Sequence, residues 1–208
     1  MSPTLIDTHG SFDAAAIAVR VQGMAARVRA TGATVVALLA DNGIDWLVAD
    51  RAVLSCGRVL LPLPTFFTDA QCRHALDAAG AGALLSDDGS RAARLGFSAL
   101  PDGAAPEPTG ALSMHVRASV QPVVLPEATC KITFTSGSTG QPKGVCLSAP
   151  QLAAVTGSLV AVGRSLGISR HLCMLPLAVL LENVAGADAA WLAGAQCIVP
   201  PLNEVGLS

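Results

Sequence analysis

The sequence predicts an α/β fold in which a mostly parallel sheet is flanked by helices. Short apolar runs without polar alternation, such as residues 34–39, are typical of strands buried on both faces. Ala- and Leu-rich stretches with apolar residues at helical spacing separate these runs, and the alternation of strands and helices indicates βαβ units. The chain has 208 residues, 51% of them hydrophobic, which is enough for one substantial core.

Local signals define the elements of the first half. Residues 11–13 lead into an Ala-rich helix over residues 14–29. A helix over residues 44–55 is expected to end before Gly57, because glycine is favoured just after a helix C-terminus. The remaining predicted elements are a strand at 59–63, a helix from Thr68 and Asp69 through Ala79 with Gly80 after it, and a strand at 83–86.

The second half follows a weakly patterned stretch rich in Gly, Pro and Ala at residues 95–108, which is the candidate loop between two halves. Residues 1–208 are otherwise predicted to form one partial domain. Helices are expected over residues 149–166, with Pro150 near the start where proline is tolerated, and over residues 179–192. Strands are expected at 111–116, 123–125, 131–135, 144–147, 173–175 and 196–199.

The most informative segment is residues 133–145, Thr-Phe-Thr-Ser-Gly-Ser-Thr-Gly-Gln-Pro-Lys-Gly-Val. Its glycines let backbone N–H groups converge on an anion, its hydroxyls donate to phosphate oxygens, and Lys143 supplies a mobile positive charge. The placement of Pro142 and Lys143 between two strand-like segments argues against a flexible linker. The predicted phosphate-binding residues are Thr135, Ser136, Gly137, Ser138, Thr139, Gly140 and Lys143.

Two common nucleotide-binding loops are excluded by the same segment. A Walker loop places Gly directly before its Lys, followed by Ser or Thr, whereas here Pro142 precedes Lys143 and Gly144 follows it. The dinucleotide fingerprint Gly-x-Gly-x-x-Gly is also absent from this stretch.

Residues 135–144, Thr-Ser-Gly-Ser-Thr-Gly-Gln-Pro-Lys-Gly, resemble the phosphate-loop signature of the adenylate-forming superfamily. This superfamily comprises acyl-CoA synthetases, luciferases and peptide-synthetase adenylation domains. Residues 36–64 are similar to its early strand–helix–strand segment, with a polar Asn turn. Residues 174–182 are similar to its next core motif, and Glu182 makes them closest to long-chain acyl-CoA synthetases. Val179 departs from the family, which often has His or an aromatic residue there.

The resemblance implies ATP-dependent activation of a carboxylate, for which a fatty acid is the expected substrate. Activation releases pyrophosphate, and the acyl group then forms a thioester with coenzyme A. The resemblance implies ATP, Mg²⁺ and CoA as cofactors and Lys143 as a catalytic residue. The other residues of the loop are implied to bind the pyrophosphate portion of ATP. The family's later motifs for adenine, metal and ribose, and its C-terminal lysine, do not occur in this sequence. The chain is therefore expected to be the N-terminal part of the fold, inactive alone.

Three other interpretations stay open. The chain could be a non-catalytic nucleotide- or acyl-binding module derived from such an enzyme, or an unrelated α/β domain whose loop binds another phosphate. Within the superfamily, an adenylation domain that loads an acyl carrier protein stays open as an alternative, because the residues that would discriminate it from a CoA ligase are missing from this sequence. The oligomeric state is left open.

Composition excludes several function classes. The net charge is −2 and the 13 Lys and Arg residues are scattered, so no nucleic-acid surface is predicted. The chain has no Tyr and 3% aromatic residues, which argues against base-stacking platforms. The N-terminus lacks the pattern of a signal peptide, and residues 172–193 are too polar to span a membrane.

The six cysteines form no Cys-x-x-Cys pair, and the four histidines do not join them at zinc spacing. Structural thiols in a cytoplasmic protein, and no metal site, are therefore predicted. His171, for which the sequence suggests no catalytic partner, is predicted to be a surface histidine, as is His74. For Glu182 and Asn183, an exposed helical face and a substrate wall are equally compatible with the sequence.

Overall fold

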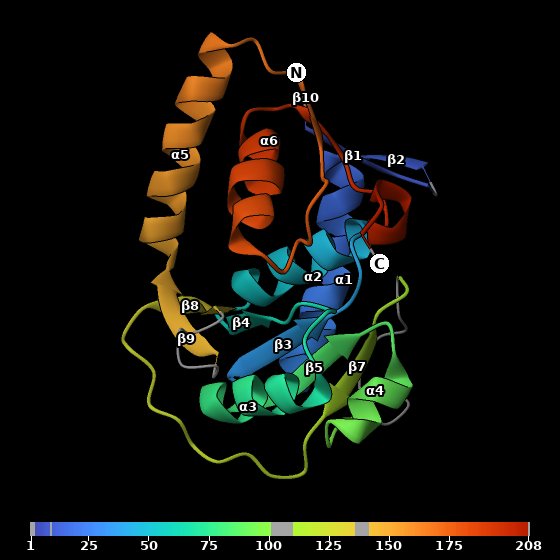
Figure 1. Cartoon of the computed structure of the whole chain (residues 1–208), viewed down its shortest axis with the longest axis vertical. Helices are drawn as coiled ribbons and strands as arrows, with labels where there is room; N and C mark the ends of the chain where they lie inside the picture. Colours follow the sequence, from blue (N-terminus) through green and yellow to red (C-terminus); the bar gives the residue numbers. More distant parts are fainter. Residues whose placement is uncertain (1–2, 9, 101–109, 136–141, 208) are drawn as a thin grey trace.

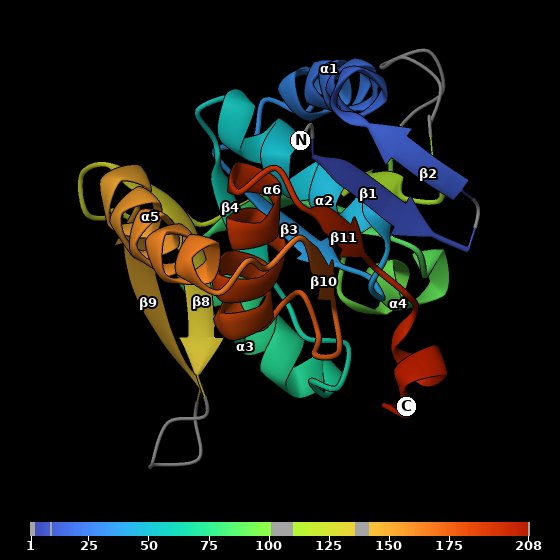
Figure 2. The same ribbon diagram turned by 90° about the horizontal axis from the view of Figure 1, so that it is seen from above.

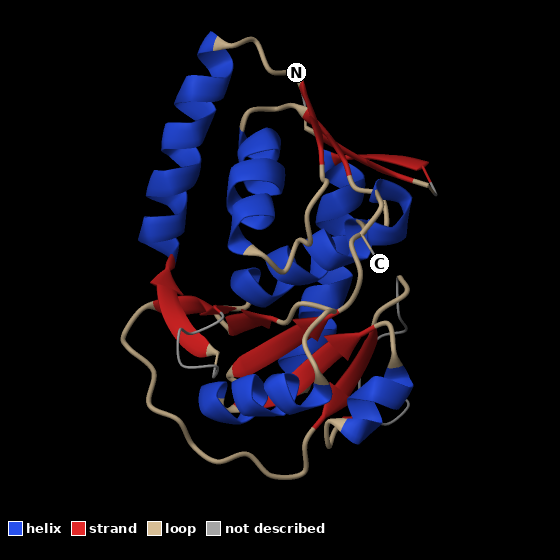
Figure 3. Cartoon of the chain, viewed as in Figure 1, coloured by secondary structure: helices blue, strands red, loops and turns tan. Residues whose placement is uncertain are grey.

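The computed structural model describes residues 3–8, 10–100, 110–135 and 142–207, and these form two sheets with helices around them (Figure 3). The larger sheet has seven strands, in spatial order β6 (Ser98–Ala99), β7 (Ser113–Val116), β5 (Ala81–Ser86), β3 (Val35–Leu39), β4 (Val59–Pro62), β8 (Thr129–Thr135) and β9 (Lys143–Ser148). The smaller sheet has four, in the order β10 (Arg170–Leu172), β11 (Gln196–Ile198), β1 (Thr4–Asp7) and β2 (Gly10–Asp13).

The centre of the larger sheet is parallel, which confirms the predicted α/β class. β3 runs parallel to β4 and β5, and β4 runs parallel to β8. The outer strands are antiparallel to their neighbours, with β7 beside β5 and β9 beside β8. In the smaller sheet β11 is parallel to both β1 and β10, while β2 is antiparallel to β1.

Helices cover both faces of the larger sheet (Figure 1). α3 (Asp69–Ala79) and α4 (Gly89–Arg94) lie on one face, and α1 (Ala14–Ala30) and α2 (Ile44–Ser55) lie on the other. The smaller sheet packs against α1 and α2 on the side away from the larger sheet. Three further helical segments are α5 (Ala149–Ser165), η1 (Leu181–Asp188) with α6 (Ala189–Leu192), and a 3₁₀ turn, η2 (Leu202–Val205).

β3 explains why the strand sequences do not alternate. Val36 and Leu38 enter the core formed with α1 and α2, whereas Val35, Ala37 and Leu39 enter the core formed with α3 and α4. Every residue of this strand is therefore buried, as expected for a parallel strand with helices on both sides.

Helix ends agree with the local signals. The Asp13 carboxylate accepts a hydrogen bond from the Ala16 backbone N–H and so caps α1. Thr68 and Gln71 form a capping box at the start of α3. Gly57 and Gly80 follow α2 and α3 with φ angles of 63° and 65°, the left-handed conformation that glycine tolerates.

Several predicted elements are wrong or displaced. Residues 123–125 do not form a strand, because prolines on both sides remove backbone donors. The strand predicted at 173–175 lies at Arg170–Leu172 instead. The hairpin of β1 and β2 and helix α4 were not predicted. Of the expected loop at 95–108, Ser98–Ala99 is a short strand and residues 101–109 lie outside the described ranges.

The helix predicted over residues 179–192 is in part a π-helix. η1 spans Leu181–Asp188 with the wider turn, and α6 continues it to Leu192. π-helical turns are rare and concentrate at functional sites. Within the described residues, no helix has the length and apolar character needed to cross a bilayer.

Candidate functional site

The predicted phosphate loop connects two antiparallel strands at one edge of the larger sheet (Figure 2). β8 and β9 pair with Thr135 opposite Lys143. β8 also runs parallel to β4, so the loop begins where parallel strands end, and ligands of open α/β sheets bind at that end. The loop residues Ser136, Gly137, Ser138, Thr139 and Gly140 lie outside the described ranges.

The two predicted site residues that the structure describes lie at the ends of this hairpin. Thr135 is the last residue of β8 and Lys143 the first residue of β9, and both are exposed. Their register places the hydroxyl and the ammonium groups on opposing strands at the base of the loop. A ligand held by the loop would therefore meet a hydroxyl donor and a positive charge together.

His74 of α3 supports the base of the loop, although the sequence suggested no role for it. Its Nε2 atom lies 3.1 Å from the carbonyl oxygen of Pro142, and its ring meets the Phe134 ring edge-on at 6.2 Å between centroids. The hydrogen bond connects the residue just before Lys143 to a helix on one face of the sheet. α3 thereby helps to fix where β9 starts.

Gly144 is required by packing across the hairpin. A Cβ atom at this position would lie 3.0 Å from Cζ of Phe134 and 3.3 Å from Cγ2 of Ile132. Phe134 and Gly144 are paired residues on β8 and β9, so the missing side chain lets the aromatic ring cover the partner strand. The glycine after Lys143 thus has a structural reason beyond the motif.

A buried ion pair anchors β8 to the rest of the fold. Lys131 is fully buried, and its Nζ atom lies 2.6 Å from a carboxylate oxygen of Asp50 on α2. The same ammonium donates to Oδ1 of Asn183 on η1. One lysine therefore joins the strand that leads to the phosphate loop to two different helices. The sequence signal for it was a lysine between the apolar residues Cys130 and Ile132 of the strand.

Asp188 at the end of η1 belongs to the same charged region. Burial, reinforced by the charge of Asp50, raises its pKa to about 6, and Arg51 lies 3.6 Å away. The folded protein thus holds this proton more tightly than the unfolded chain does. The contribution of the protonated Asp188 carboxyl group to the free energy of unfolding is fully present below about pH 4 and is lost as the pH rises through about 6.

Replacing Asp188 with asparagine is therefore expected to raise the free energy of unfolding at neutral pH by about 1–3 kcal/mol. The gain should grow between about pH 4 and pH 6 and stay constant above. Denaturant unfolding measured across this pH range tests it. As a control, Asp77→Asn, at a carboxylate that is 67% exposed, should change stability by less than about 1 kcal/mol. Unchanged pH dependence in Asp188→Asn would contradict the assignment.

Asn42 connects the two weaker segments of the family resemblance. Its Nδ2 atom donates to the carbonyl of Leu175 at 2.9 Å, and its Oδ1 atom accepts from the backbone N–H of Leu177 at 2.8 Å. The polar turn after β3 thereby holds the segment that follows β10. These two segments are far apart in the sequence, and the folded chain brings them into direct contact.

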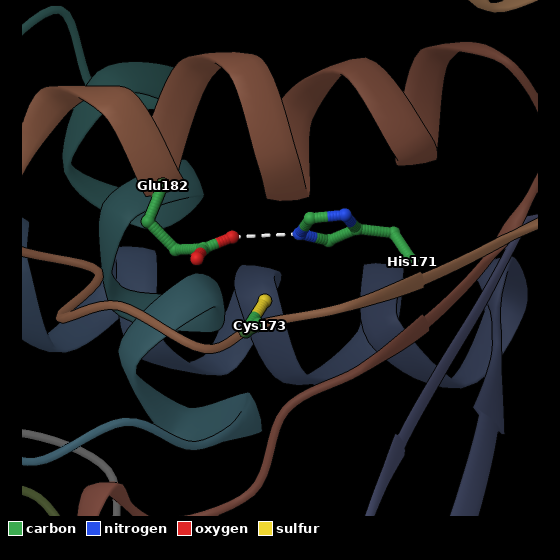
Figure 4. A group of neighbouring side chains, drawn as sticks. All are labelled: His171, Cys173 and Glu182. Atoms are coloured by element: carbon green, nitrogen blue, oxygen red, sulfur yellow. Dashed lines mark hydrogen bonds and ion pairs between the residues drawn. The ribbon is translucent and has the colours of Figure 1, made fainter. Parts of the chain in front are cut away.

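His171, which the sequence predicted to be a surface histidine, is half-buried and has a charged partner. Its Nε2 atom lies 2.6 Å from Oε1 of Glu182, and its side chain is 29% exposed (Figure 4). Glu182 is buried rather than on an exposed face, and its other oxygen accepts from the backbone N–H groups of Met174 and Leu175. This carboxylate thereby fixes the turn that follows β10.

The pKa values of this pair reflect the contact. The hydrogen bond to Glu182 raises the pKa of His171, although burial opposes the shift. Burial by itself raises the pKa of Glu182, but the hydrogen bonds from His171, Leu175 and Met174 outweigh it and place the pKa below its usual range. The pair therefore favours a charged imidazolium and a carboxylate.

The sequence of this chain matches proteins of one family. A family model for AMP-binding enzymes matches residues 3–207. A 3-[(3aS,4S,7aS)-7a-methyl-1,5-dioxo-octahydro-1H-inden-4-yl]propanoyl:CoA ligase from Mycobacterium tuberculosis is 32% identical over 200 residues, covering 86% of this chain and 39% of that enzyme. A plipastatin synthase from Bacillus subtilis is 32% identical over 141 residues, or 66% of this chain and 5% of that protein.

The fold agrees with that of a solved CoA synthetase. The o-succinylbenzoate CoA synthetase of Bacillus subtilis, in complex with its acyl-adenylate intermediate, superimposes with a TM-score of 0.71 at 22% identity, covering 93% of this chain and 51% of that one. That enzyme has also been solved with ATP and a magnesium ion. The chain thus spans well under two thirds of these relatives. By the match over residues 3–207, it belongs to the AMP-binding enzyme family of adenylate-forming proteins.

Proposed function

We propose that this chain carries the phosphate-binding part of an enzyme that uses ATP to activate a carboxylate as an acyl-adenylate, releases pyrophosphate, and transfers the acyl group to the thiol of coenzyme A. The observation that carries the proposal is the unbroken motif from Thr135 to Gly144, which joins β8 to β9 at the carboxyl end of a parallel strand. The family match and the similarity to a CoA ligase support it.

The proposed roles follow from the chemistry of pyrophosphate departure. Negative charge grows on the β- and γ-phosphates as they leave, and fixed donors and cations stabilise it. Gly137 and Gly140 would allow close approach of the backbone, and Lys143 would supply the charge. Hydroxyl donors are proposed at Thr135, Ser136, Ser138 and Thr139. Mg²⁺, when bound with ATP, would share the charge of the phosphates.

Replacing Lys143 with alanine is expected to lower kcat/KM for adenylation by about 100- to 1000-fold, as the loss of a group that stabilises the developing charge typically does. The measurement is carboxylate-dependent pyrophosphate release, in a chain that includes this segment and turns over. Lys143→Arg should retain part of the rate because it keeps the charge, whereas Arg164→Ala, at an exposed cation near the end of α5, should leave it unchanged. An unchanged rate of pyrophosphate release in Lys143→Ala would contradict the catalytic role proposed for Lys143.

We further propose that the carboxylate is a fatty acid, which is supported by the resemblance of residues 174–182 to long-chain acyl-CoA synthetases. Pyrophosphate release with fatty acids of several lengths and with ring-containing acids tests this. The assay is run on this chain and on any longer chain that contains it. Activity confined to the longer chain is expected, because a phosphate loop by itself supplies few of the transition-state contacts. A preference for ring-containing acids would reject the fatty-acid assignment.

A second candidate is an adenylation domain that loads an acyl carrier protein, and the similarity to a plipastatin synthase favours it. The two candidates differ in the thiol that receives the acyl group. Acyl transfer to free coenzyme A, but not to a carrier protein bearing a phosphopantetheine thiol, would support the first. The reverse result would support the second. ATP binding without pyrophosphate release in any chain would favour a non-catalytic binding module.

A further inference from the structure

Three side chains with metal-ligating atoms meet where β10 and β11 face η1, and a fourth contacts one of them. His171 and Cys173 come from β10 and the residue just after it, Cys197 comes from β11, and Glu182 comes from η1. Figure 4 shows the Cys173 sulfur directed toward the contact between the Glu182 carboxylate and the His171 ring. The metal-ligating atoms of His171, Cys173 and Glu182 all lie within 4.8 Å of one another.

Cys197 lies beside this group, next to Cys173. Its sulfur lies 3.7 Å from that of Cys173, and both residues are fully buried. Zn–S bonds of about 2.3 Å at a tetrahedral angle place two thiolates about 3.8 Å apart. The two sulfurs therefore already have the spacing of two ligands on one zinc ion. His171 and Glu182, now 2.6 Å apart, would have to separate by less than about 1 Å to act as the other two.

Gly186 leaves the room that the Glu182 and His171 side chains occupy. A Cβ atom at position 186 would overlap Oε1 of Glu182 and lie 2.5 Å from Nε2 of His171. His171 and Gly186 also line a cavity of about 270 Å³ between α5 and α6, which gives an ion a route to the cluster. The sulfurs themselves are not accessible, so a small ion fits this site better than an organic substrate of a reactive thiol.

We propose that His171, Cys173, Glu182 and Cys197 form a binding site for a Zn²⁺-type divalent cation. Two sulfurs, one imidazole nitrogen and one carboxylate oxygen are the donors that this borderline-soft ion accepts, and four protein ligands are typical of a structural site. The bound ion would connect η1 to β10 and β11, two neighbouring strands of the smaller sheet.

The test is metal uptake by the whole 208-residue chain, stripped with a chelator and kept reduced by a phosphine. One equivalent of Zn²⁺ is expected by elemental analysis after desalting. Co²⁺ should give thiolate-to-metal absorption and the visible bands of a tetrahedral ion. Cys173→Ser and Cys197→Ser should lose that absorption, and His171→Ala should weaken Zn²⁺ binding more than about 10-fold. Cys146→Ser, a thiol on β9 outside the cluster, is the matched control and should bind as the unaltered chain does.

Gly186→Ala keeps all four ligands and obstructs the space between two of them, so it is expected to lose Zn²⁺ while circular dichroism shows the fold retained. This variant separates loss of the site from failure to fold. Absence of Zn²⁺ uptake by the reduced, folded chain would overturn the proposal. Zn²⁺ uptake that persists in both Cys173→Ser and Cys197→Ser would overturn it as well. A chain that binds no metal when reduced and forms a Cys173–Cys197 disulfide in air would also overturn the proposal. None of these measurements depends on adenylation activity.

Discussion

Replacing Lys131 with alanine is expected to lower the free energy of unfolding by about 3–5 kcal/mol. The ammonium is fully buried and lies 2.6 Å from the carboxylate of Asp50, which is itself 1% exposed. Without the lysine, Asp50 would stay charged with its partner missing, or take up a proton at a further cost in free energy. Asn183 would also lose the donor to its side-chain oxygen. Equilibrium denaturation in urea measures the change.

Two further variants separate the lost charge pair from lost packing. The double variant Lys131→Met with Asp50→Leu removes both charges at similar volume, so it should recover most of the stability. Lys143→Ala, which removes the exposed lysine at the other end of the same hairpin, should cost less than about 0.5 kcal/mol. If the single and double variants lose the same stability, the destabilisation comes from packing and the ion-pair explanation is wrong.

Replacing Glu182 with alanine is expected to lower the free energy of unfolding by about 2–4 kcal/mol in metal-free buffer, because a hydrogen bond to a charged group typically contributes about 1.5–3 kcal/mol. The carboxylate accepts from the backbone N–H groups of Met174 and Leu175 at 3.1 and 2.9 Å and from His171 at 2.6 Å. Urea denaturation with a chelator present measures this loss independently of any bound cation.

Glu182→Gln provides the graded comparison. The amide oxygen of glutamine can still accept hydrogen bonds from the backbone, but the substitution removes the negative charge opposite His171. The free energy of unfolding is therefore expected to fall by less than in Glu182→Ala. Glu204→Ala, at an exposed glutamate in η2, should lie within about 0.5 kcal/mol of the unaltered chain. Equal stability of Glu182→Ala and Glu204→Ala would show that the hydrogen bonds of Glu182 do not contribute.

Elements set by local chemistry were predictable. The helix starting at Thr68 and ending before Gly80 depends on a capping box and a left-handed glycine, which are written in neighbouring residues. The buried strand β3 needs only a run of apolar side chains. β1 was missed because its parallel partner is distant in the sequence: Thr4 pairs with Gln196 of β11, near the other end of the chain. The false strand at 123–125 had strand-like side chains, but Pro122 and Pro126 beside it lack the backbone N–H groups that strand pairing needs.

The site divides in the same way. The Thr135–Gly144 motif is contiguous, so its residues could be named from the sequence together with their chemistry. The support beneath it could not, because Lys131 and Asp50 are separated by 81 positions and Asn42 and Leu177 by 135. A lysine among apolar neighbours shows that a partner must exist in the fold, but it does not show which residue that partner is.

The α/β class, most element positions and the motif that identifies the family could be predicted from the sequence. These properties depend on periodicity, caps and contiguous residues, which act over a few positions of the chain. The packed fold was needed to show the buried charge that anchors β8, the support of β9 by His74, and the meeting of His171, Cys173 and Glu182 beside Cys197. Such groups form when parallel strands and a π-helix bring distant residues to one place, and the distances between their atoms are properties of the packed fold.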